Sequence, residues 1–446
     1  MTRLSVVLLV LMSALALLVS AGKAPPPPAS SGYSAVTAFS GTATYRSAGR
    51  VVYDGAGNLW AVATFQGGSL SLGTASITTV NLAIGVFRRD AATGTWAGVA
   101  FEATALSYEV EALGIAVDST GKATIVGRVS GDVRITATLV VGSGNLQVNS
   151  ILVIQVSSAL VPGTAFASVN TVNAVAGSAW LEANNAVGIG AYASGNVALG
   201  GQSITNAASF ASVYFRLDST GAAVAKAKLT TTGQIFGGCH NPSTSRSYVV
   251  SGMSVVGIAN SGASPATQGP YTVGSAGGQL QCIACAGSSV QADGYFTGTA
   301  TVGSTTLVAT GSNDAITFNL DTASLAPVSA NQGHATSEGR GVGGLKGASA
   351  PLVWSAGHML GGGSLSGVAI PNYSPKYVTY LATVSAGSVY ANVTASDSTN
   401  GSSVVYASAI NAAGSKIGIF VIVSGTSVKF GLLTARAGLN LVEYTV

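Results

Sequence analysis

The sequence predicts an all-β fold built from a repeated unit of four short antiparallel strands. Runs rich in β-branched and aromatic residues recur along the chain, Asp and Gly turns bound them, and no long capped helical period follows the N-terminal segment. Only 8% of the 446 residues are charged and 59 are glycine, against about 25% charged and about 7% glycine in ordinary domains. A net formal charge of +4 argues against a nucleic-acid surface, and 48% apolar residues argue against a disordered chain.

The first 22 residues have the pattern of a secretory signal peptide. Arg3 gives a positive start, residues 4–19 form an almost unbroken apolar stretch, and small residues follow. This stretch is shorter than the roughly 20 residues of a membrane span. We therefore expect cleavage after Ala21 or Gly22 and no retained anchor.

Residues 23–32 contain four consecutive prolines followed by Ser and Gly. Prolines of this kind favour an extended rod, and the small residues after them restore flexibility. The sequence thus predicts a signal peptide at 1–22, a spacer at 23–32 and one folded domain at 33–446.

A strand motif recurs at intervals of roughly 45 to 65 residues, the range of propeller blades. Its seven copies are residues 57–64, 121–128, 184–190, 247–252, 294–298, 352–357 and 403–408. Most copies of this motif are followed by a second run, in which apolar and polar residues alternate. These runs are residues 82–90, 151–156, 213–221, 315–321, 377–381 and 417–422.

Aspartates mark the turns that join the strands, as at Asp54, Asp118 and Asp218, each followed three residues later by Gly. An Asp side chain accepts hydrogen bonds from the backbone two residues on, and Gly tolerates the positive φ of a tight turn. A calcium loop would need several oxygen ligands close together. Each turn offers one or two, so we interpret these aspartates as turn residues.

One four-stranded sheet cannot bury both of its faces alone, whereas sheets stacked radially cover one another and leave short edges. The pattern Gly114-Ile-Ala-Val-Asp-x-x-Gly, with Val213-Tyr-Phe-Arg-Leu-Asp-x-x-Gly further on, resembles the secreted seven-bladed β-propeller repeats known as SBBP repeats. The resemblance covers most of residues 45–446 and implies a secreted or cell-surface protein. It implies no catalytic residue.

We expect seven four-stranded blades. Six or eight blades are the alternatives, because the spacing between Ser247 and Gly294 is short. The strand at 279–285 could belong to either neighbouring blade, so one blade is expected to be irregular. Residues 33–45 alternate like a strand and precede the first full unit. We predict that this N-terminal strand completes the last blade and closes the ring.

Candidate catalytic and metal-binding groups are sparse. His240, His334 and His358 are the three histidines, and none has a second His or a Glu at metal-binding spacing. We interpret each as a lone surface or loop residue. Glu102, Glu109 and Glu111 alternate as on a solvated strand face. We predict no catalytic, cofactor or metal site.

Three cysteines predict one disulfide and one remaining thiol in an oxidising compartment. We expect Cys239 to pair with Cys282 or Cys285; a zinc site that adds His240 is the alternative. Asn372, Asn392 and Asn400 fit the N-glycosylation pattern.

Two functional hypotheses follow. The first is a secreted, non-enzymatic structural or binding protein of the cell surface or extracellular matrix. Its partners would be surface proteins, glycans or further copies of itself, assembled into fibres or sheets through propeller faces or the N-terminal strand. It would bind no nucleic acid and would not insert into membranes after signal cleavage. The alternative is a secreted propeller enzyme, a polysaccharide lyase or hydrolase, which needs Asp or Glu, His and Tyr gathered at one mouth of the ring.

Overall fold

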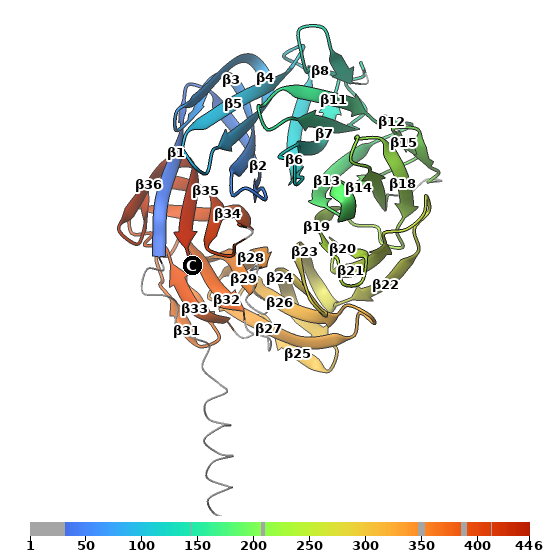
Figure 1. Cartoon of the computed structure of the whole chain (residues 1–446). Coiled ribbons are helices and arrows are strands. Elements are labelled where there is room, and N and C mark those ends of the chain that lie inside the picture. The colour runs from blue at the N-terminus through green and yellow to red at the C-terminus, as the bar shows by residue number, and fades with distance from the viewer. Residues whose placement is uncertain (1–31, 143, 207–209, 347–352, 385–389, 412) are drawn as a thin grey trace, which may run out of the picture.

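A computed structural model describes residues 32–142, 144–206, 210–346, 353–384, 390–411 and 413–446, and these form a ring of antiparallel sheets (Figure 1). The predicted signal peptide and residues 23–31 of the predicted spacer lie outside the described residues. In the described part, the helical element is a 3-10 turn, η1 (Ala183–Asn185), and no helix there is long and apolar enough to cross a membrane. The prediction of an all-β propeller is confirmed.

Twenty-eight of the strands within the described residues sort by their pairing into seven four-stranded units. The innermost strands are β2 (Thr44–Tyr53), β6 (Glu109–Val117), β13 (Ala174–Leu181), β19 (Ile235–Asn241), β23 (Gly274–Ala286), β28 (Glu338–Lys346) and β34 (Gly401–Ile410). The second strands are β3 (Leu59–Leu72), β7 (Ala123–Ser130), β14 (Val187–Ala193), β20 (Arg246–Ser251), β24 (Ser289–Val302), β29 (Val353–Leu360) and β35 (Lys416–Phe430).

The third strands are β4 (Ala75–Arg89), β10 (Ser150–Val156), β17 (Ala211–Leu217), β21 (Ser254–Ala259), β26 (Asp314–Asp321), β32 (Tyr377–Val384) and β36 (Leu433–Thr445). The outer strands are β5 (Trp96–Ala103), β11 (Pro162–Ala167), β18 (Ala223–Lys228), β22 (Thr267–Thr272), β27 (Pro327–Ala335), β33 (Tyr390–Ala395) and, for the last unit, β1 (Gly32–Gly41). The short additional strands lie outside these four-stranded units: β8 (Asp132–Arg134), β9 (Val140–Gly142), β12 (Val169–Asn170), β15 (Val197–Leu199), β16 (Gln202–Ile204), β25 (Thr305–Val308), β30 (Gly363–Leu365) and β31 (Val368–Ile370).

The ring is closed by the N-terminal strand. β1 pairs antiparallel with β36, so that Gly32 lies opposite Thr445 and Val36 opposite Val442. Its far end also pairs with β3 of the first unit, where Phe39 lies opposite Leu72. The predicted closure is therefore confirmed. The strand is shorter than predicted, because β1 ends at Gly41 and Tyr45 already belongs to β2.

One expectation about the units was wrong. The fourth unit is regular, since β19, β20, β21 and β22 pair in order, and residues 279–285 belong to β23 of the fifth unit. The seventh copy of the strand motif, residues 403–408, lies in innermost strand β34, whereas the other copies lie in or overlap second strands.

Apolar side chains fill the spaces between neighbouring units. Trp60 and Ile84 of the first unit pack in one cluster with Ile115 and Leu152 of the second, and all four are buried. The same packing joins the last unit to the first through Phe420. Because each unit buries both faces in this way, few charged residues are needed in the strands.

Three buried carboxylates reach from one unit to the next. Glu182 accepts hydrogen bonds from Tyr214 of its own unit and from Ser247 of the next, at 3.0 and 2.6 Å. Asp293 accepts from Ser355 of the sixth unit at 3.0 Å. Burial raises the pKa of both Glu182 and Asp293.

Glu443 is the third of these carboxylates and lies at the closing seam. It accepts a hydrogen bond from the Tyr53 hydroxyl at 3.1 Å and forms an ion pair with Arg89, both in the first unit. Beside it, Tyr33 of β1 packs edge-on against Phe430 and Tyr444, with ring centroids 5.3 and 5.2 Å apart. The seam thus combines a backbone ladder, an ion pair and aromatic packing.

We predict that deletion of residues 32–41 lowers the melting temperature by about 10 °C or more, because β36 loses its ladder partner and the aromatic contacts of Tyr33. A chain that begins at residue 32 is the control and is expected to melt like the mature protein. Thermal unfolding followed by circular dichroism measures both. Equal melting temperatures for the deletion variant and the control would show that β1 does not hold the ring closed.

Candidate functional site

A β-bulge interrupts every innermost strand. At each bulge one strand carries an extra residue relative to its partner, which breaks the alternation of side chains and redirects the strand. One bulge from each strand gives the set Arg50, together with Gly49, and Leu113, Gly177, Phe236, Gln281, Val342 and Tyr406; β2 and β23 each have a further register shift, at Arg46 and between Ser275 and Gly277. We call this set the bulge ring.

Four members of the bulge ring, Arg50, Phe236, Gln281 and Tyr406, line one cavity of about 200 Å³. We call it the central cavity. The innermost strands contact one another in sequence, and β34 contacts β2, so the central cavity lies inside the ring of innermost strands. A second cavity of about 350 Å³ shares the first three of these residues and extends along β19 and β23.

Arg50 crosses the middle of the ring. Its guanidinium donates hydrogen bonds to the Phe236 carbonyl oxygen at 3.2 Å and to the Tyr406 carbonyl oxygen at 3.3 Å. Phe236 belongs to the fourth unit and Tyr406 to the seventh. Burial lowers the pKa of Arg50, and the nearby Cys282 opposes this shift.

A polar cluster borders the central cavity on β28 and β29. Arg340 forms an ion pair with Glu338 at 2.7 Å and lies over the Tyr295 ring, 4.6 Å from its centroid. Glu338 also accepts a hydrogen bond from the Tyr377 hydroxyl at 2.8 Å. The positive charge of Arg340 is therefore balanced by a carboxylate.

His358 lies in β29 and is only 5% exposed. Its ring meets Tyr377 edge-on, with centroids 5.3 Å apart, and its Nδ1 is buried without a hydrogen-bond partner among the described residues. Burial, with a smaller contribution from Arg340, lowers the pKa of His358 to about 3. The interpretation of His358 as a surface or loop residue was therefore wrong: a β-strand places it beside the central cavity.

The other two histidines are more accessible. His240 in β19 is partly buried, and its Nδ1 contacts the Asn260 amide at 2.8 Å. Burial lowers its pKa. His334 in β27 is half-exposed, with its Nδ1 3.5 Å from Asp314. Within the described residues, no three His, Cys, Asp or Glu side chains are grouped so that they could hold a metal ion.

The disulfide joins Cys239 of β19 to Cys285 of β23 and so links the fourth and fifth units. Cys282 lies outside it, three residues before Cys285 on the same strand. All three cysteines line the second cavity. No zinc ligand set forms around Cys239 and His240 among the described residues.

A separate cavity of about 350 Å³ lies between the first and second units. Glu109, Glu111 and Arg128 line it, together with Arg46 and Tyr108. Arg128 pairs with Glu111 at 2.8 Å and with Glu109 at 3.6 Å, so one cation serves both carboxylates. These are the glutamates expected on a solvated strand face, and Glu109 is in fact exposed.

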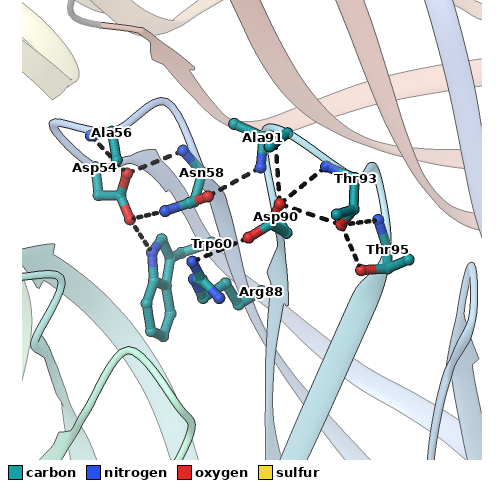
Figure 2. Close-up of polar contacts among 10 residues, drawn as sticks. Asp54, Ala56, Asn58, Trp60, Arg88, Asp90, Ala91, Thr93 and Thr95 are labelled. Carbon is teal, nitrogen blue, oxygen red and sulfur yellow. Dashed lines mark hydrogen bonds and ion pairs between the residues drawn. The ribbon is translucent and has the colours of Figure 1, made fainter.

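The turn aspartates act through hydrogen bonds, as the sequence predicted. Figure 2 shows the Asp54 carboxylate accepting hydrogen bonds from the Asn58 amide and the Trp60 indole. The Asn58 side chain in turn accepts from the backbone of Ala91, which ties two turns of the first unit together. The carboxylates of Asp118 and Asp218 also stabilise their turns. Each accepts a hydrogen bond of 2.9 Å from the backbone N–H of the residue two positions on.

The three candidate glycosylation residues all lie at exposed positions of the sixth and seventh units. The Asn372 side chain accepts a hydrogen bond from the Ser374 backbone, and Asn392 donates to Thr383. Asn400 lies in the turn that precedes β34. Glycosylation at these residues stays a prediction.

Comparison with protein-family models and with curated proteins yields no match. Among solved structures, one similar chain belongs to the mitotic checkpoint complex, with 9% identity and a TM-score of 0.53 over 95% of this chain and 97% of that one. The WD40 repeats of RRP9 are similar over 93% of this chain and 99% of that chain, with 8% identity and a TM-score of 0.52. At such identity the likeness shows the fold, a β-propeller built of repeats.

We predict that His358 makes the protein less stable in mild acid. The unfolded chain takes up a proton on this histidine below pH 6.5, its ordinary pKa, whereas the buried side chain stays neutral down to about pH 3. The free energy of unfolding therefore keeps the full contribution of neutral His358 above pH 6.5. It falls as the pH is lowered, and at pH 5 it is about 2 kcal/mol smaller.

Urea unfolding at pH 7.5 and pH 5 measures this effect in the wild type and in His358→Gln. The variant is expected to lose about 2 kcal/mol less than the wild type between the two pH values. The difference between variant and wild type in the free energy of unfolding at pH 7.5 measures the cost of the altered packing. This cost is the same at both pH values and cancels in the comparison. Equal losses in both proteins would show that His358 is not buried in its neutral form.

Proposed function

We propose that the protein is a secreted, non-enzymatic binding or structural protein of the cell surface or extracellular matrix. The propeller would act as a rigid platform that presents its faces and rim to surface proteins, glycans or further copies of itself. This function matches the SBBP-type resemblance, and the repeated propeller fold supports its architectural part.

One observation carries the proposal: all 15 acidic side chains of this chain contribute to structural contacts. Each accepts a hydrogen bond or forms an ion pair within the protein. They are Asp54, Asp90, Glu102, Glu109, Glu111, Asp118, Asp132, Glu182, Asp218, Asp293, Asp314, Asp321, Glu338, Asp397 and Glu443. General acid–base catalysis needs a carboxyl or imidazole group positioned toward a substrate. Here each carboxyl group is engaged in a hydrogen bond or an ion pair within the protein.

The disulfide supports a secreted location. Disulfides such as Cys239–Cys285 form and persist in oxidising compartments and are rare where glutathione keeps thiols reduced. The predicted signal peptide at 1–22 points the same way. Both features lead to the expectation of an extracellular or cell-surface protein.

An apolar part of the rim supports contacts with a partner. Strand β9 is an edge strand that pairs with β8, and it lies against β11. Exposed aliphatic side chains gather on β9, β11, β12 and their loops: Leu139, Val140, Leu146, Val161, Val169 and Val172. We call this set the aliphatic rim. Val169 is 78% exposed, and a group of exposed apolar side chains is typical of interaction surfaces.

The N-terminal strand offers a second route to assembly. β1 pairs with β36 of the same chain, and a neighbouring copy could supply the same strand with the same hydrogen bonds. Such an exchange would link copies without a new interface. The low charge of the surface would oppose association only weakly.

A secreted propeller enzyme, a polysaccharide lyase or hydrolase, is the second candidate. The cavity lined by Glu109, Glu111 and Tyr108 favours it, because two carboxylates and a phenol lie near one another there. Cleavage of a polysaccharide by the purified protein, lost in Glu111→Gln, would establish this alternative and overturn the non-enzymatic function.

We predict that the mature chain, residues 23–446, associates as its concentration rises, because the aliphatic rim is apolar and weakly charged. Sedimentation velocity and negative-stain electron microscopy measure the assemblies. The pair Val140→Lys and Val169→Lys is expected to shift the protein toward the monomer by placing like charges on the rim. Val308→Lys is the matched control, since Val308 is 58% exposed on another unit. A monomer at every concentration would contradict self-assembly.

We predict that a secreting host exports the full chain and removes its signal peptide. N-terminal sequencing of the exported protein is expected to begin at residue 22 or 23. A chain that starts at residue 23 is the control and is expected to stay inside the cell. Recovery of uncleaved protein in the membrane fraction would show that residues 4–19 anchor the chain.

A further inference from the structure

The central cavity holds a positive charge without a matching negative one. Arg50 uses two of its N–H groups on main-chain carbonyls, and within the described residues it makes no further hydrogen bond or ion pair. A guanidinium has five N–H donors and stays protonated in proteins. Three donors therefore remain for another acceptor.

The residues that line the two inner cavities include no Asp or Glu. The nearest acid along the lining strands, Glu338, is already paired with Arg340 and Tyr377. Arg50 is partly buried, and withdrawing part of a charge from water without a partner is unfavourable. An anion in the central cavity would supply the missing partner.

Gln281 is the second polar group of the central cavity. Its Oε1 is buried and accepts no hydrogen bond from the part of the chain that the structure describes. Gln281 lines both inner cavities together with Arg50. A buried amide oxygen of this kind requires a donor, and a hydroxyl group on a ligand would provide one.

The remaining walls combine apolar and aromatic side chains with the imidazole of His358 and with Arg340, whose charge is paired with Glu338. Phe236, Val404, Val405 and Tyr406 line the central cavity. Tyr406 is 40% exposed, so the cavity reaches solvent beside it. Pockets that combine apolar walls with a few convergent polar groups are typical of sites for small organic ligands.

We propose that the central cavity binds a small hydroxy acid, the chemical class that includes sugar acids. Arg50 binds the carboxylate through its remaining N–H groups, and Gln281 accepts a hydrogen bond from a ligand hydroxyl. The aromatic and aliphatic walls contact the carbon skeleton. The site goes beyond the proposed function and requires neither secretion nor assembly.

Isothermal titration of the mature chain with glucuronate tests this proposal. Glucose, which lacks the carboxylate, and acetate, which lacks hydroxyl groups, are the matched probes. Glucuronate is expected to bind with one site per chain, and both other probes at least tenfold more weakly. Equal binding of glucuronate and glucose, or of glucuronate and acetate, would overturn the proposal, as would no binding.

Variants locate the site. Arg50→Gln is expected to weaken glucuronate binding at least tenfold and Gln281→Leu about threefold to tenfold. Arg216→Gln is the control, because Arg216 also donates to a main-chain carbonyl but on strand β17. It is expected to bind glucuronate like the wild type. If Arg50→Gln fails to fold, Gln281→Leu and the three probes test the proposal. Unchanged affinity of Gln281→Leu for glucuronate would show that the ligand does not bind in the central cavity.

Discussion

The antiparallel pairing of β1 with β36 is the interaction on which the rest of the structure depends. A sheet in a propeller is stable only when both of its faces are covered, and a ring covers every face only when its last unit meets its first. At this junction Phe420 of the last unit packs with Leu59 and Phe65 of the first. Without the closing strand, β36 would be an open edge, and the seam around Glu443 would lose its support.

Closure also determines what happens in the middle of the ring. Seven innermost strands converge there, and some approach so closely that only glycine fits: a Cβ on Gly177 would lie 2.1 Å from the Ile235 carbonyl oxygen. Gly177 is itself a bulge residue, and at other bulges larger side chains, such as Arg50 and Phe236, line the cavities. The central cavity is therefore a product of the closed ring.

The sequence predicted the features that local chemistry controls. The turns at Asp54, Asp118 and Asp218 and the alternation of the strands depend on neighbouring residues, so their patterns were visible. The bulges at Phe236 and Gln281 depend on how strands from distant parts of the chain fit together, and no local pattern marks them. The burial of His358 has the same origin: the strand motif was predicted to end at residue 357, and β34, which lines the same cavity, lies further along the chain.

The closing strand also has a consequence for how the protein is made. β1 is the first of the described strands to leave the ribosome, yet its partner β36 is the last. During synthesis the other units can fold in order, while residues 32–38 of β1 have no β36 to pair with for nearly the whole length of the chain. Completion of the ring is therefore a late step that follows the emergence of β36, and the interval before it is when the strand is most exposed to pairing with another molecule.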